Sequence, residues 1–145
     1  MDEGENKTVE VSKDMAQKEF EDYCEANDLD CNIDGMNDED KKSLEKVRKR
    51  FIRACMQGRV KVNGQLLVYT ISDFSPNGYK GREIEIKRPG GHAFAGMDGY
   101  KETQNVHRLN GFLSAMTGQE VVFFSKIDGS DWQFFRDISL LFLAD

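Results

Sequence analysis

The sequence contains few of the residues from which metal sites and disulfides are built. Its 145 residues include two histidines and three cysteines. Cys24, Cys31 and Cys55 are an odd number without CxxC pairing, so we expect free thiols in a reducing compartment. Neither His92 nor His107 stands at a familiar metal-ligand spacing from a cysteine. The sequence therefore predicts no metal site and no cofactor.

Long hydrophobic runs are also missing. No apolar run approaches the ~18 residues that a transmembrane helix needs, so we expect no membrane partner. The first residues are acidic and polar, which is not the pattern of a secretory signal peptide. Charged residues make up 32% of the chain and hydrophobic residues 39%, as in a soluble globular domain. These features predict an intracellular, cytoplasmic protein.

Motifs of the common catalytic and nucleotide-binding sites do not occur. The sequence has no GxSxG nucleophile motif, no GxGxxG dinucleotide motif and no GxxxxGK[ST] phosphate loop. We therefore expect no enzyme activity. A small enzyme that uses His92 or His107 is kept only as a third hypothesis.

The segment 30–41 begins like a calcium-binding loop. Its first six residues, Asp-Cys-Asn-Ile-Asp-Gly, match an EF-hand loop, and predicted helices flank the segment. The twelfth position is Lys41, where an EF-hand has its bidentate carboxylate, and a cation there opposes metal binding. We interpret the segment as a turn rich in Asp and Asn between two helices.

Charge is distributed unevenly along the chain, whose formal net charge is −6. Residues 1–40 contain fifteen acids and three lysines, a net charge of −12, and residues 1–11 are predicted to be disordered. Residues 41–61 contain nine basic residues and one acid, a net charge of +8. This contrast predicts either pairing of the two regions or two surfaces for different partners. The candidate binding residues on the basic helix are Lys46, Lys49, Arg50 and Arg53.

Residues 12–58 are predicted to form a helical N-terminal segment. Ser12 is placed as the cap of a first helix. Asn37 or Asp38 caps a second helix, and Gly58 ends it. The buried face of the second helix is predicted to consist of Leu44, Val47, Phe51, Ala54 and Cys55.

From residue 59 the apolar residues alternate, which is the pattern of strands. Asn63-Gly64 stands between two such runs and predicts a hairpin with a type I′ turn, in which both central residues have positive φ. Residues 82–88 alternate in the same way and predict a third antiparallel strand. Residues 120–126 are β-prone and are expected to form a fourth strand or an extended connector.

The C-terminal part is predicted to form a helical hairpin. Residues 92–101 are expected to form a loop, Thr103 to cap the next helix and Gly118 to end it. Ser130 is placed as the N-cap of the last helix. The polar face of the last helix consists of Gln133, Arg136 and Asp137. The core of the hairpin is predicted to contain Val106, Leu109, Leu113, Met116, Trp132, Phe135, Ile138, Leu141 and Phe142.

Together these elements predict an α+β fold. A small antiparallel sheet of three to four strands carries N-terminal helices and a C-terminal helical hairpin packed on one face. Residues 59–145 form the α+β domain. The last helix is so apolar that it is either buried from two sides or keeps part of its surface for a partner. The surplus apolar residues, which are candidates for partner contact, are Phe123, Phe134 and Leu140.

An ordered set of short motifs runs from residue 60 to residue 144. The motifs are, in order, a hairpin strand at 68–71, a strand ending in Arg-Pro-Gly at 88–90, a helix ending in Leu113-x-x-x-Thr117-Gly118, the approach Ile127-Asp128-x-x-Asp131, and a final helix ending in Phe142-Leu143. In this order they resemble the tail assembly chaperones of long-tailed bacteriophages, especially the Mu-like branch.

That resemblance implies a small, non-catalytic phage or prophage protein in the cytoplasm of the bacterial host. It implies that the protein coats the helical tape-measure protein before the tail tube polymerises and is absent from the finished virion. The tail tube protein and a second copy of the chain are further possible partners. The alternative is a regulatory or nucleic-acid-binding module that uses the basic helix 41–57, although the acidic net charge disfavours nucleic acid.

Overall fold

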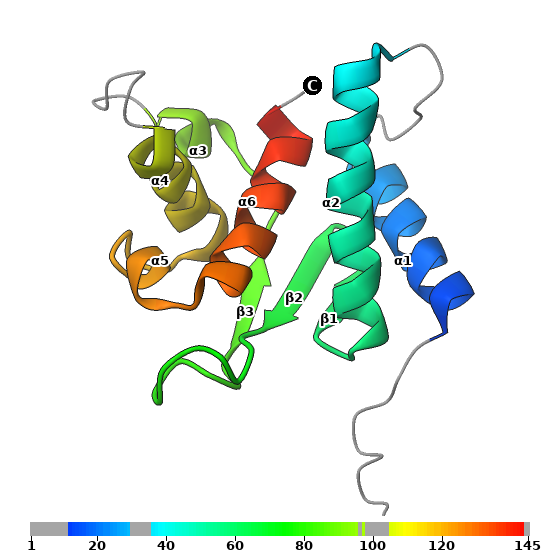
Figure 1. Ribbon diagram of the computed structural model, residues 1–145. Helices are drawn as coiled ribbons and strands as arrows, with labels where there is room; N and C mark the ends of the chain where they lie inside the picture. Colours follow the sequence, from blue (N-terminus) through cyan, green and yellow to red (C-terminus); the bar gives the residue numbers. More distant parts are fainter. Residues whose placement is uncertain (1–11, 30–35, 96, 98–104, 144–145) are drawn as a thin grey trace, which may run out of the picture.

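The computed structural model describes residues 12–29, 36–95, 97 and 105–143 (Figure 1). Within them the fold is α+β, as predicted, with a three-stranded antiparallel sheet and helices from both ends of the chain. The predictions that lie outside the described residues concern the state of residues 1–11, the calcium-like positions 30–35, half of the loop 92–101 and the Thr103 cap.

Two N-terminal helices begin at the residues that the sequence predicts. α1 spans Lys13–Ala26, and the side chain of Ser12 accepts a hydrogen bond at 3.3 Å from a backbone N–H of its first turn. α2 spans Asp38–Met56, and Asn37 Oδ1 accepts a similar hydrogen bond at 2.8 Å. Both caps satisfy a donor that the first helical turn leaves unpaired. Gly58 follows α2 with a φ of 78°, the left-handed conformation in which glycine ends a helix.

The sheet is an antiparallel meander in the order β1-β2-β3. β1 spans Val60–Asn63, β2 spans Leu66–Thr70 and β3 spans Glu83–Ile86. Leu67 and Ile86 are register partners and are fully buried, whereas both glutamates of β3 are exposed. One face of the sheet therefore belongs to the core, as the alternation predicts.

The turn between β1 and β2 differs from the predicted one by one position. Asn63 is still part of the ladder, so the two central residues are Gly64 and Gln65. Gly64 has a φ of 62°, and neither Asn63 nor Gln65 has a positive φ. Positive φ at the first central position alone fits a type II′ turn, so the type I′ prediction is wrong. The Gln65 side chain donates at 3.3 Å to the backbone at the end of α1, which fixes the second turn position on that helix.

Two short helices occupy segments that the sequence predicts as irregular or extended. α3 spans Gly91–Ala95, at the start of the predicted loop. α5 spans Phe123–Lys126, so the prediction of a fourth strand or extended connector there is wrong. The backbone hydrogen bonds of this segment are local, at 2.9, 3.2 and 3.0 Å. A helical turn lets both Phe123 and Phe124 be buried, whereas a strand would point them to opposite faces.

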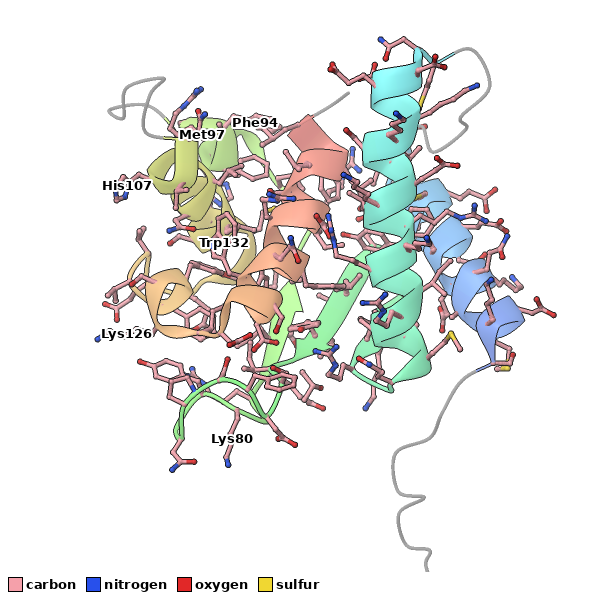
Figure 2. All side chains as sticks on the ribbon, viewed as in Figure 1. Lys80, Phe94, Met97, His107, Lys126 and Trp132 are labelled. Atoms are coloured by element: carbon pink, nitrogen blue, oxygen red, sulfur yellow. The ribbon has the colours of Figure 1, made fainter. Side chains whose placement is uncertain are left out.

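The last helix, α6, occupies the centre of the fold. α6 spans Gly129–Leu143 and lies between α2 and α4 (Asn105–Thr117), over the buried face of the sheet (Figure 1). Trp132 lies on the side of α6 that faces α4 (Figure 2), where its Nε1 donates to Asn110 Oδ1 at 2.7 Å. The predicted core residues Phe135, Ile138, Leu141 and Phe142 of α6 are buried, with exposure of at most 8%.

Two details of the predicted helical hairpin are wrong. Val106 is 54% exposed, because residues in the first turn of α4 are exposed and full burial begins at Asn110. The cap of α6 is Asp128 rather than Ser130. Asp128 Oδ2 accepts hydrogen bonds from Ser130 N at 2.9 Å and from Ser130 Oγ at 2.6 Å. Asp and Ser are equally good caps, so the pattern alone does not separate two candidates that stand two residues apart.

The cysteines are not all free. Cys55 is a buried free thiol, and burial raises its pKa to about 12. Cys24 is disulfide-bonded, so the prediction of free thiols is wrong for this residue. An odd number of cysteines leaves one thiol over but does not prevent two others from pairing.

Candidate functional site

α6 is attached to α2 by an ion pair whose carboxylate is buried. Asp137 is 1% exposed, although helical winding assigns it to the polar face of α6. Arg50 of α2 donates from Nε to Asp137 Oδ2 at 2.5 Å and from Nη2 to Asp137 Oδ1 at 2.9 Å. These hydrogen bonds raise the pKa of Arg50. A bidentate pair of this kind fixes orientation as well as distance, so it holds the two helices in one register.

A groove of about 530 Å³ opens beside this ion pair, between α2 and α6. We call it the α2–α6 groove. Its apolar lining includes Leu44, Val47, Leu140 and Leu141. Its charged lining includes Asp40, Lys46, Arg50, Arg136 and Asp137. An apolar floor beside charges of both signs can accept one face of an amphipathic helix.

Three of the predicted contact residues come together in the α2–α6 groove: Lys46, Arg50 and Leu140. Leu140 is 38% exposed, so its side chain is only partly covered by α2 and α6. Lys49 and Arg53 are exposed on α2 but do not line this groove. The sequence analysis did not predict the groove, because it considered the basic helix and the last helix as two separate surfaces.

The other two apolar candidates lie in the core. Phe134 is 4% exposed and stacks on Tyr69, with 4.2 Å between ring centroids. Phe123 is 5% exposed and lies 5.8 Å from Tyr79 and 6.4 Å from Phe135, between ring centroids. Both rings are enclosed by other aromatic rings, so neither offers surface to a partner in this conformation.

A second buried carboxylate, Asp131, anchors the other end of α6. Asp131 Oδ1 accepts hydrogen bonds from Tyr69 Oη at 2.6 Å and from Ser72 N at 3.0 Å. Oδ2 accepts from Ser72 Oγ at 2.8 Å and from Ser75 Oγ at 2.6 Å. Arg59 Nη1 lies 3.7 Å from Oδ1 and supplies the counter-charge.

This Asp131 network is structural. The carboxylate is fully buried and accepts four hydrogen bonds, so it has no free lone pair for a substrate. It ties the start of α6 to the loop between β2 and β3. The sequence analysis placed Asp131 only in the motif Ile127-Asp128-x-x-Asp131. The feature that could have indicated the network is the pair Ser72 and Ser75, because two hydroxyls in one loop require nearby hydrogen-bond acceptors.

The same loop carries the most exposed large apolar side chain of the described residues. Phe74 is 81% exposed, whereas Ser72 and Ser75 on either side of it are buried by their hydrogen bonds to Asp131. The loop therefore holds Phe74 outward from a fixed base. The sequence analysis did not single out Phe74. A phenylalanine among turn-forming residues could have indicated an exposed ring.

Neither histidine stands in a catalytic or metal-binding cluster among the described residues. Both are exposed, and Figure 2 shows His107 pointing outward from α4. In the part of the chain that the structure describes, no group of three or more His, Cys, Asp or Glu side chains could hold a metal ion. No described helix combines the length and the apolar character that crossing a bilayer requires.

Comparison with models of protein families, with curated proteins and with solved structures finds no match to this chain.

Proposed function

We propose that this protein is a non-catalytic tail assembly chaperone of a long-tailed phage or prophage, and that its α2–α6 groove binds a helical segment of the tape-measure protein. The observation that carries the proposal is the groove itself, an open apolar floor bordered by a fixed ion pair. The order of motifs from residue 60 to residue 144, which resembles these chaperones, supports the same function.

The groove suits an amphipathic helix. Leu44, Leu140 and Leu141 supply apolar surface from two helices, and an incoming helix would cover it with side chains spaced three and four residues apart. Asp40 and Lys46 offer charges of opposite sign to the polar edges of that helix. Apolar contact would provide most of the affinity and the charges would orient the partner.

The Arg50–Asp137 pair makes this surface ready for binding. Its two hydrogen bonds fix the floor before any partner arrives, so little conformational entropy is lost when the groove is filled. A tape-measure protein contains many helical segments, and its chaperone has to release each of them when the tail tube assembles. A shallow groove on a rigid base fits that requirement for reversible binding.

The proposed protein acts in the cytoplasm of the bacterial host and is absent from the mature virion. The tail tube protein is a second proposed partner, and a second copy of the chain is a third. The rival function, nucleic-acid binding through Lys46, Lys49, Arg50 and Arg53, is weakened by the structure. Arg50 donates from Nε and Nη2 to Asp137, so its charge already has a counter-ion, and Lys46, Lys49 and Arg53 are left for phosphates.

Co-expression tests the proposal. The full chain, carrying an affinity tag, is produced together with the tape-measure protein encoded in the same operon, and the tagged chain is purified. We expect the tape-measure protein to co-purify and to remain soluble. A tape-measure protein that aggregates equally with and without the chain would contradict the proposal. Tight duplex DNA binding with a steep dependence on salt would favour the rival function instead.

A further inference from the structure

A second groove, of about 460 Å³, runs between α1 and α2 and is strongly basic. We call it the basic groove. Ile52 forms apolar lining, and Glu45 is its one acidic residue. Its basic lining consists of Lys13 from α1 and Lys42, Lys46, Arg48 and Lys49 from α2.

These basic side chains lack counter-ions within the described residues. Some described cations outside the groove form ion pairs, such as Arg50 with Asp137 and Lys61 with Glu83. None of the five basic residues of the groove forms an ion pair with any residue in the ranges 12–29, 36–95 and 105–143. Lys42 and Lys46 are four residues apart on one helix, where like charges repel. The groove therefore favours an anionic occupant.

We infer that the basic groove is a docking site for the acidic segment of this same chain, residues 1–11. That segment contains four acids, Asp2, Glu3, Glu5 and Glu10, against Lys7, a net charge of −3. The signs of charge on the segment and on the groove are complementary.

The position of the segment in the chain suits this role. Residue 11 precedes Ser12, the cap of α1, and Lys13 is itself part of the groove. Ten extended residues reach at most about 33 Å. The 14 residues of α1 are about 21 Å long, so the segment can turn back along the groove and reach its far end. Because the segment is tethered, its effective concentration at the groove is about millimolar.

When the segment is docked, it competes with other anionic ligands for the basic groove. Exposed ion pairs are individually weak and screened by salt, so the docked state is reversible and disappears at high ionic strength. Lys46 lines both grooves, so docking also places negative charge beside the α2–α6 groove. The inference does not depend on the proposed function, because its tests use no tape-measure protein.

The first test compares amide NMR spectra of the full chain and of a variant in which Asp2→Asn, Glu3→Gln, Glu5→Gln and Glu10→Gln are combined. At 20 mM NaCl we expect shift differences at Gln17, Lys46 and Lys49, and we expect them to vanish at 0.5 M NaCl. As a control, Glu83→Gln with Glu85→Gln on the exposed face of β3 should shift only amides near the sheet. Differences confined to residues 12–14 would overturn the inference.

The second test uses a fluorescent polyglutamate peptide as an anionic probe. Neutralising the segment should raise the affinity of the peptide about tenfold at 20 mM NaCl, because the tethered competitor is gone. Lys46→Gln combined with Lys49→Gln should abolish that gain, whereas Lys61→Gln combined with Lys80→Gln, outside the groove, should preserve it. Equal affinities for the wild-type and neutralised chains would overturn the inference. Circular dichroism checks that each variant is folded.

Discussion

At the scale of single residues, two carboxylates position α6. Asp131 fixes its first turn to the loop after β2, and Asp137 fixes its middle to α2. Both are buried, and in both each carboxylate oxygen accepts at least one hydrogen bond, which is the condition under which a buried charge is tolerated. Each therefore determines where a helix lies rather than what reaction occurs.

Asp131→Ala should destabilise the fold by about 3 kcal/mol, because it leaves Arg59 without its counter-charge and four donors without their acceptor. Urea denaturation followed by tryptophan fluorescence measures this loss. Asp73→Ala in the same loop is the matched control, since Asp73 is exposed, and should change stability by at most about 0.5 kcal/mol. Similar midpoints for the two variants would contradict the role assigned to Asp131.

Leu140→Lys tests the α2–α6 groove. Leu140 is 38% exposed, so the substitution should cost about 0.5 kcal/mol of stability but weaken tape-measure binding about tenfold or more. The binding loss follows because a lysine ammonium would have to be desolvated against an apolar partner. Quantitative pull-down measures binding and thermal denaturation measures stability.

The control for Leu140→Lys is Val122→Lys. Val122 is 53% exposed and precedes α5, away from both helices of the groove. Val122→Lys should leave binding to the tape-measure protein unchanged. Equal binding by the wild-type chain and Leu140→Lys would remove Leu140 from the interface, and failure of Leu140→Lys to fold would place it in the core.

At the scale of elements, the β1–β2 turn shows what one glycine contributes. Gly64→Ala should cost about 1–2 kcal/mol, because a φ of 62° strains any residue with a Cβ. Nothing lies within 4 Å of an added Cβ, so the loss would be conformational strain rather than a clash. Asn63→Ala should be nearly neutral by comparison, since Asn63 is an exposed ladder residue. Denaturation midpoints in urea measure the stability loss of each variant. A larger loss for Asn63→Ala than for Gly64→Ala would support the type I′ turn instead.

The cap of α6 makes a prediction about pH. Hydrogen bonds from the side chain and backbone of Ser130 lower the pKa of Asp128 below its ordinary value of 3.8. Its stabilising contribution is therefore present above pH 4 and is lost as pH falls through the lowered folded-state pKa. Asp128→Ala should cost about 1 kcal/mol at pH 7 and less at pH 2.5, which is below the ordinary pKa of the side chain. Urea titrations at both values measure the difference, and a pH-independent loss would contradict the cap.

Elements with a repeating pattern were predictable, and elements whose form depends on tertiary contacts were not. Ser12 and Asn37 stand directly before amphipathic stretches, so cap and period agree on α1 and α2. The segment at α5 is β-prone by composition, but the core has room for two adjacent rings on one side, and a helical turn is the geometry that provides it. Local secondary-structure propensity contains no information about this packing of the two rings.

The candidate site was predictable only in part, for a similar reason. Helical winding identifies Leu140 as an outward apolar residue and Lys46 as an outward cation. It also assigns Asp137 to solvent, because the sequence does not show that α2 lies against that face. The groove is a property of two helices, one ending at Met56 and the other beginning at Gly129, so only the packing reveals it.

At the scale of the whole molecule, the N-terminal helices and the sheet share one hydrophobic core. Phe51 of α2 lies 5.0 Å from Phe20 of α1 and 6.1 Å from Phe134 of α6, between ring centroids. The core thus crosses the boundary at residue 58 that composition suggests. Contacts of this kind couple the two parts, so one cooperative unfolding transition is expected for the chain.

The central place of α6 has a consequence for synthesis on the ribosome. Asp137 is separated from Arg50 by 87 positions, and Asp131 from Tyr69 by 62. A nascent chain that ends before residue 129 lacks the Phe134 ring that stacks on Tyr69 and the carboxylate that pairs with Arg50. The core can close only after Gly129–Leu143 leaves the exit tunnel, so apolar side chains that α6 covers in the folded protein stay accessible to other chains until then.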